Sequence, residues 1–172
     1  MIEFPSLAGL ASHLMSRTVS ELSGTRRGLK RAAEAIERTS KDEIGFYQDA
    51  VGPFPAWAQL AESTEASKAA KGYPADAPLL ATGEMQGSIQ HEIGDWEAII
   101  GSTDPKMIFH EFGTSRMPAR PVMGPALYHN LELVQRLIGA AAAEGMYDGG
   151  KEIHPALGYD VVVMPNSLPV IP

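Results

Sequence analysis

The chain has 172 residues, which suffice for one domain of ordinary size or for a smaller core with appendages, and we expect the second organisation. Its 14 basic and 21 acidic residues give a net charge of −7, which argues against a general nucleic-acid binder with a basic surface. The absence of cysteine excludes disulfides, thiolate metal sites and cysteine nucleophiles.

Two further absences bear on localisation. The first residues, Met1 to Pro5, lack a basic segment followed by an apolar core, and no stretch approaches about 18 consecutive apolar residues. We therefore expect no membrane partner and a protein that is made and used in the cytoplasm.

The N-terminal segment, residues 1–50, predicts a long helix. Small and apolar residues recur at a spacing of three and four from Leu7 to Tyr47, which is typical of one helix face. Unbroken, this helix would span about 60 Å, so we expect its far end to contact another subunit. Gly24 and Gly28 each cost about 1 kcal/mol relative to alanine, so two helices that meet near Ser23 are the alternative. The small residues suit close contact with another helix.

The same segment is basic. Between Arg17 and Lys41 there are seven basic and three acidic residues. This pattern indicates a solvated helix face, or else a surface that docks onto an acidic partner or onto passing DNA. The residues that would contact DNA are Arg26, Arg27, Lys30 and Arg31.

Glycine and proline interrupt residues 51–81 and leave room for a short helix at about 55–70. A mostly irregular segment of this length is typical of chain that wraps a surface or an adjacent subunit. Trp57 and Leu60 are its expected anchors. A large indole buries most of its area and needs a hydrogen-bond partner for its N–H group.

Residues 82–145 are the expected α+β core. Apolar and polar residues alternate on both sides of Gly94-Asp95, which predicts a hairpin with a two-residue turn that begins with a positive φ at Gly94 and a hairpin end at Gly101-Ser102. Asp104 and Pro105 predict the start of a short helix, as N-cap and first helical residue.

That short helix should end at Gly113 and carry Met107, Ile108 and Phe112 to the core. Pro125 then predicts a second helix that ends near Gly145 and packs across the sheet. Its expected apolar face comprises Leu127, Leu131, Val134, Ile138 and Ala141.

Residues 146–172 contain one predicted strand, Tyr159 to Met164, followed by three prolines that favour an extended C-terminal arm or an edge addition. The fold class is therefore α+β. It combines a long N-terminal helix or helix pair, a small and mostly antiparallel sheet with a hairpin, a packing helix after an Ala-Arg-Pro loop, and the arm. We treat the whole as one compact domain with appendages.

Enzyme motifs are weak in this chain. His110-Glu111 lacks the second histidine of a zinc helix, because position 114 is threonine. His129 and Glu132 have a spacing that can present two metal ligands, but no second such pair follows. No Ser-His-Asp elbow or nucleotide-binding loop is present. We expect no catalytic residue, cofactor or metal ligand, and a metal-dependent hydrolase that uses His110 and Glu111 is the alternative from another class.

Glu111 and Arg120 flank a loop at residues 113–118. A planar guanidinium can bind a carboxylate through two parallel hydrogen bonds, so this pair should fix the loop or join two subunits. Two independent exposed charges are the other interpretation. Gly113 and Gly83 occupy positions that predict a positive φ, and Pro118 and Pro121 should stiffen the loop.

The order of these motifs resembles one known family. The segment from Phe109 to Pro121 has Glu111 followed by Phe-Gly-Thr, a short basic turn and Ala-Arg-Pro. Upstream lie Trp57-Ala58-Gln59-Leu60, Thr64, Leu80-Ala81-Thr82-Gly83 and Ser88-Ile89. Together they resemble the tail-completion and head-tail joining (neck) proteins of long-tailed bacteriophages and the related virion-morphogenesis proteins. The chain departs from this pattern at Val122, where the family often has an aromatic residue, and at Met85, where leucine is typical.

The resemblance implies a structural protein, not an enzyme, located in the virion neck or tail and in the host cytoplasm during assembly. It implies a homo-oligomeric ring, a hexamer by the symmetry of the tail, with neighbouring connector or stopper, tail-terminator and tail-tube proteins as partners. A tail terminator or a tail-tube-associated assembly protein is the alternative. The expected assembly loop comprises Glu111, Gly113, Thr114, Arg116, Met117, Pro118, Arg120 and Pro121. The expected structural turns and anchor are Trp57, Thr82, Gly83 and Ser88.

Overall fold

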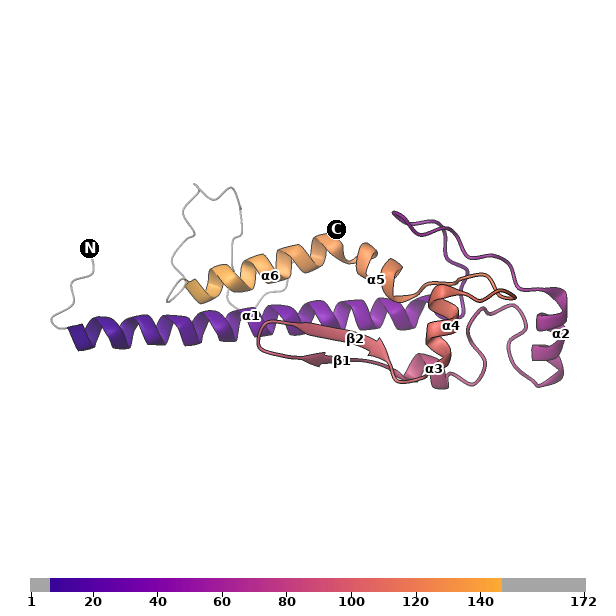
Figure 1. Ribbon diagram of the computed structural model, residues 1–172, viewed down its shortest axis with the longest axis horizontal. Helices are drawn as coiled ribbons and strands as arrows, with labels where there is room; N and C mark the ends of the chain where they lie inside the picture. The colour runs from indigo at the N-terminus through magenta and orange to yellow at the C-terminus, as the bar shows by residue number, and fades with distance from the viewer. Residues whose placement is uncertain (1–6, 147–172) are drawn as a thin grey trace.

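The computed structural model describes residues 7–146, and the protein has the α+β fold that the sequence predicts. Figure 1 shows an elongated molecule in which one helix runs along the long axis. The predicted strand at Tyr159 to Met164 and nearly all of the arm lie outside the described residues. The elements in chain order are α1 (Leu7–Glu43), α2 (Glu62–Ala70), α3 (Glu84–Gly87), β1 (Ile89–Ile93), β2 (Ala98–Ser102), α4 (Lys106–Phe112), α5 (Met123–His129) and α6 (Leu131–Met146).

The N-terminal helix α1 is a single helix of 37 residues and does not break near Ser23. Gly24 and Gly28 are both buried on it. A Cβ atom at Gly28 would lie 2.7 Å from the Cβ atom of Ala141 and 2.9 Å from the carbonyl oxygen of Leu137, both in α6. Gly28, which lowers helix propensity, therefore lets α6 approach α1 closely, and the packing offsets its cost of about 1 kcal/mol.

Helix α6 packs along α1 and not across the sheet, so that prediction is wrong. The hairpin of β1 and β2 also packs on α1, and Figure 1 shows α6 and the hairpin on opposite sides of this helix. Gly28 lies on the side of α1 that α6 covers. The long helix thus separates the two elements that the sequence suggested would touch.

The predicted helix that opens at Pro125 is two helices, α5 and α6, which meet at Asn130. The Asn130 side-chain amide donates one hydrogen bond to the Thr39 hydroxyl (2.8 Å) and one to the Ala126 carbonyl (2.8 Å). An asparagine side chain competes in this way with the backbone for hydrogen bonds and favours helix ends. The contact with α1 therefore fixes the place where α5 ends.

The hairpin is antiparallel, with Ile89 opposite Ser102 and Ile93 opposite Ala98, and it ends at Ser102 as predicted. Its turn lies one position later than predicted, because Gly94 donates its N–H to the Glu97 carbonyl (2.9 Å) and Asp95 and Trp96 form the tip. Gly94 does not have a positive φ. The shift changes the pairing by two residues, which leaves the same side chains on each face.

The hydrophobic core lies at the C-terminal end of α1, where α3, α4, the base of the hairpin and the loop before α5 meet. Its buried members are Ile44, Trp57, Met85, Ile89, Met107 and Val122. Helix α4 contributes only Met107 to it. Ile108 and Phe112 are 61% and 80% exposed, so their predicted burial is wrong. A helix of seven residues that lies on the surface of a core can bury only one face.

Candidate assembly surface

Residues 113–121 form a tightly fixed turn directly after α4. Helix α4 begins at Lys106, one residue later than predicted, and the Asp104 side chain accepts a hydrogen bond from the Lys106 N–H (2.9 Å). Gly113 ends the helix with φ +70°. A Cβ atom at Gly113 would lie 2.8 Å from the backbone nitrogen of Ala119 and 2.9 Å from the Met117 carbonyl. Both the positive φ and the lack of space require glycine here.

The tip of this turn closes on itself. Thr114 donates its N–H to the Met117 carbonyl (2.8 Å), and the Thr114 hydroxyl accepts the N–H of Arg116 (3.3 Å). The side chains of Thr114 and Arg116 are exposed, as is Pro118. The turn therefore presents its side chains to the surroundings from a backbone that is already ordered.

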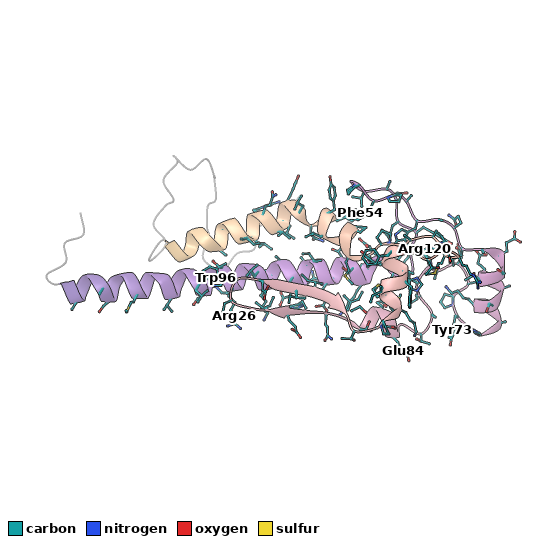
Figure 2. All side chains as sticks on the ribbon, in the orientation of Figure 1. Arg26, Phe54, Tyr73, Glu84, Trp96 and Arg120 are labelled. Carbon is teal, nitrogen blue, oxygen red and sulfur yellow. The ribbon has the colours of Figure 1, made fainter. Side chains whose placement is uncertain are left out.

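Arg120 fastens the turn to the irregular segment and does not contact Glu111. Its side chain is buried, its Nε and Nη2 atoms donate to the Ala58 carbonyl (3.2 and 2.9 Å), and Nη2 also donates to the Gln59 carbonyl (3.2 Å). The Arg120 N–H donates to the His110 carbonyl (2.7 Å). In Figure 2 Arg120 lies where the turn and this segment meet. The predicted pairing of Glu111 with Arg120 is therefore wrong, although both residues fix the loop.

Glu111 instead caps α5. Its carboxylate accepts hydrogen bonds from the backbone N–H groups of Val122 (2.8 Å), Met123 (3.3 Å) and Gly124 (3.4 Å). These N–H groups have no partner within the helix, and a negative charge at this end is favoured by the helix dipole. Sequence reasoning missed this role because the carboxylate comes from a different helix.

Trp57 anchors the irregular segment, as predicted. It is 5% exposed, and its Nε1 atom donates to the Pro121 carbonyl (3.1 Å). The segment wraps this chain's own body: Phe54 packs against Gly124 so closely that a Cβ atom there would lie 2.3 Å from the ring. The helix predicted at 55–70 is shorter, Glu62–Ala70, and buries none of its residues.

The second group of predicted turn residues shapes the base of the hairpin. Gly83 has φ +83° just before α3, and the Thr82 hydroxyl accepts the N–H of Glu84 (3.4 Å). The Ser88 hydroxyl donates to the Met85 carbonyl (2.6 Å) and shares a hydrogen bond with the Ser102 hydroxyl (2.7 Å). Thr82, Gly83 and Ser88 therefore have structural roles within the chain.

One face of α4 is apolar and exposed. Ile108, Phe109 and Phe112 are 61%, 55% and 80% exposed, and we call these three residues the α4 face. Phe112 follows Ile108 by four residues and Phe109 by three, so the three side chains lie on one side of the helix, opposite the buried Met107. Four apolar residues among seven in Lys106–Phe112 cannot all face one core, which is the sequence signal for this surface.

A second feature that sequence reasoning missed is a buried carboxyl group. Glu43, near the end of α1, is 5% exposed, and neither of its carboxyl oxygens has a hydrogen-bond partner. Burial, and then the nearby charge of Glu111, raise the pKa of Glu43 to about 8. Glu43 lines an open cavity of about 260 Å³ together with Thr39, Asp42, Gln48 and His129. The carboxyl is therefore held in its neutral form at neutral pH.

The residues proposed for metal chemistry are not brought together. Within residues 7–146 no group of three or more histidine, aspartate or glutamate side chains is arranged to hold a metal ion. His110 lies half-buried behind the turn, and burial together with the charge of Arg120 lowers its pKa. His129 lines the cavity beside Glu43, and Glu132 is exposed on α6.

The basic segment of α1 is partly paired with acidic groups. Arg26 lies 4.0 Å from Asp95 in the hairpin turn, and Lys30 lies 3.8 Å from Glu34. Lys41 and His91 both hydrogen-bond to Glu37, and these bonds, that of Lys41 first, lower the pKa of Glu37. Through His91 this group also fastens β1 to α1.

No protein-family model, curated protein or solved structure matches the chain. None of the helices in residues 7–146 combines the length and the apolar character needed to cross a lipid bilayer.

Proposed function

We propose that this protein is a structural component of the neck or tail of a long-tailed bacteriophage, which completes the tail end and joins it to the capsid connector as part of an oligomeric ring. The order of motifs from Trp57 to Pro121 supports this assignment through its resemblance to the neck family. The geometry of the same residues supports a role in binding other proteins.

The observation that carries the proposal is the apolar α4 face next to the fixed turn. Three large apolar side chains stand exposed beside a backbone that is held by Gly113, by the buried Arg120 and by the Glu111 cap. Contiguous exposed apolar surface marks sites of protein association, and an ordered loop loses little entropy when a partner binds it.

The length of α1 supports assembly in the same way. A helix of 37 residues is about 55 Å long, and Figure 1 shows that its N-terminal part extends beyond α6 and the hairpin. Met15 and Val19 on this part are 72% and 64% exposed. Such a projecting helix offers apolar side chains to a neighbouring subunit.

The test is complementation of phage whose copy of this gene is interrupted at Trp57, followed by electron microscopy of the particles. Filled heads and finished tails that never join would support the neck role. Tails of abnormal length would support the terminator role within the same proposal. Normal infectious virions without the protein would refute both.

A matched pair of variants connects this test to the α4 face. Phe112→Asp places a charge on the exposed face, and we expect it to fail to restore joined virions. Phe46→Asp changes a 71% exposed aromatic residue that belongs neither to α4 nor to the turn, and it should restore them. Equal restoration by the two variants would remove the α4 face from the proposal.

A further inference from the structure

A second exposed apolar surface lies at the other end of the hairpin, away from α4. It comprises Trp96, which is 70% exposed at the tip of the hairpin turn, together with Met15 and Val19 of α1. We call these residues the hairpin end. Figure 1 shows that the turn points along α1 toward its N-terminus, while α4 lies at the base of the hairpin.

The contact between Arg26 and Asp95 shows how the hairpin end is built. Arg26 lies beside the turn, and Figure 2 shows Arg26 and Trp96 at the same place along α1. Val19 and Met15 precede Arg26 by seven and eleven residues, close to whole numbers of helical turns, so all three share one face of α1. The apolar side chains of α1 and Trp96 therefore lie on the same side of the molecule.

The exposed charges without a partner in the chain differ in sign between the two surfaces. Arg26 lies 4.0 Å from Asp95 and Lys106 lies 3.6 Å from Asp104, so these charges are partly neutralised. Glu92 and Glu97 remain on the hairpin, and Arg116 remains in the turn after α4. Within the part of the chain that the structure describes, neither Glu97 nor Arg116 forms an ion pair. Charge complementarity of this kind selects the partner surface and its orientation.

We propose that the hairpin end of one copy docks on the α4 face of the next copy, with Trp96 against Phe109 and Phe112 and with Glu97 beside Arg116. The inference rests on the proposed ring function and states which surfaces make the ring. Two copies joined through like surfaces would bring equal charges together, whereas unlike surfaces pair opposite charges and aromatic side chains.

Such a contact is heterologous, so each copy uses both surfaces and the assembly grows in one direction. Rotation between successive copies closes the assembly into a ring. Trp96 is the expected energetic centre of the interface, because a tryptophan that becomes buried in an aromatic pocket is a typical hot spot.

Crosslinking tests the contact, and the absence of cysteine lets an introduced cysteine report only its own position. Asp95→Cys protein is mixed with Ser115→Cys protein, and a short thiol-specific crosslinker is added. Both positions are exposed, and both variants keep Trp96, the α4 face, Glu97 and Arg116 intact. Mixed dimers are expected, and a protein that carries both cysteines should give a ladder that ends at the ring.

Charge reversal provides the specific control. Glu97→Lys or Arg116→Glu alone should reduce the yield of mixed dimers about tenfold, and mixing the two reversed proteins should restore most of it. Ser63→Cys on α2 is exposed, and Figure 1 shows α2 at the end of the molecule opposite the hairpin turn, so this variant should not crosslink to Ser115→Cys of another copy.

The same crosslinks are measured on purified protein and in cells that produce particles. Crosslinks only between identical variants, or none in either setting, would overturn the contact. The crosslinking and the gene interruption test different claims. Unjoined heads and tails without mixed dimers would support the proposed function and refute this contact. Mixed dimers together with normal virions in the interrupted phage would support the contact and refute the proposed function.

Discussion

Replacing Glu43 by glutamine should stabilise the protein at neutral pH. The Glu43 carboxyl is buried without a hydrogen-bond partner, and its pKa is raised from 4.5 to about 8. Below pH 4.5 the group is protonated in both the folded and the unfolded chain. As the pH rises above 4.5 the unfolded chain ionises while the folded chain stays protonated, so the free energy of unfolding falls until the pH passes the folded pKa of about 8.

The size of the effect follows from the two pKa values. Each tenfold difference in proton affinity is worth about 1.4 kcal/mol. At pH 7, ionisation of Glu43 in the unfolded chain therefore stabilises the unfolded state relative to the folded state by on the order of 3 kcal/mol. Glutamine has nearly the same shape and cannot ionise. The free energy of unfolding of Glu43→Gln should therefore exceed that of the unmodified protein by about 3 kcal/mol at pH 7, and the difference should shrink as the pH falls toward 4.

Urea unfolding followed by circular dichroism at several pH values between about 4 and 8 measures this difference. His110, whose pKa is lowered, affects both proteins alike, so its contribution cancels in the comparison. Asp42→Asn is the matched control, because Asp42 lines the same cavity but is exposed, and it should change stability by less than about 0.5 kcal/mol. A difference between Glu43→Gln and the unmodified protein that is the same at pH 4 and pH 7 would refute the reasoning.

Three other predictions concern the packing, and urea unfolding measures the stability of each variant. Gly28→Val should destabilise the protein by about 1–3 kcal/mol, because α6 leaves no room for a side chain at this position. Gly139→Ala, in open space on α6, should stabilise the protein by up to about 1 kcal/mol. Equal effects of the two substitutions would contradict the close contact between α1 and α6. Trp57→Phe removes the hydrogen bond to the Pro121 carbonyl and should cost about 1–2 kcal/mol, and an unchanged midpoint would show that this bond is not needed. Arg120→Leu should lower the free energy of unfolding by about 2–3 kcal/mol and speed proteolysis within residues 51–81. Arg116→Leu, at an exposed position, should change neither quantity. Similar results for both variants would show that Arg120 does not anchor residues 51–81.

The sequence alone determined part of the local structure. The three and four spacing predicted α1, the alternation around Gly94 predicted the hairpin, and Asp104 and Gly113 predicted both ends of α4. Trp57 was recognised as a buried anchor because an indole of that size needs burial and a partner for its N–H group. Each of these features depends on backbone preferences or side-chain size within a few residues of chain.

The proposed site was predictable only in part. The positive φ of Gly113 follows from the sequence pattern of the loop. The burial of Arg120 and Pro121 and the partners of Glu111 and Arg120 do not. Both are charged residues that flank one loop, which made a pair plausible. The carboxylate instead satisfies the free N–H groups of α5, and the guanidinium satisfies carbonyl groups of a distant segment.

Only the tertiary structure decided which faces are covered. It placed α6 on α1, ended α5 where Asn130 reaches Thr39, left Ile108 and Phe112 exposed, and buried Glu43 without a partner. These outcomes depend on contacts between residues far apart in the chain. The local periodicity of a helix shows which of its faces is apolar, but it does not show which other element covers that face. The sequence therefore predicted α1, the hairpin and α4, whereas long-range packing determined where the later helices begin and end and which surfaces stay exposed.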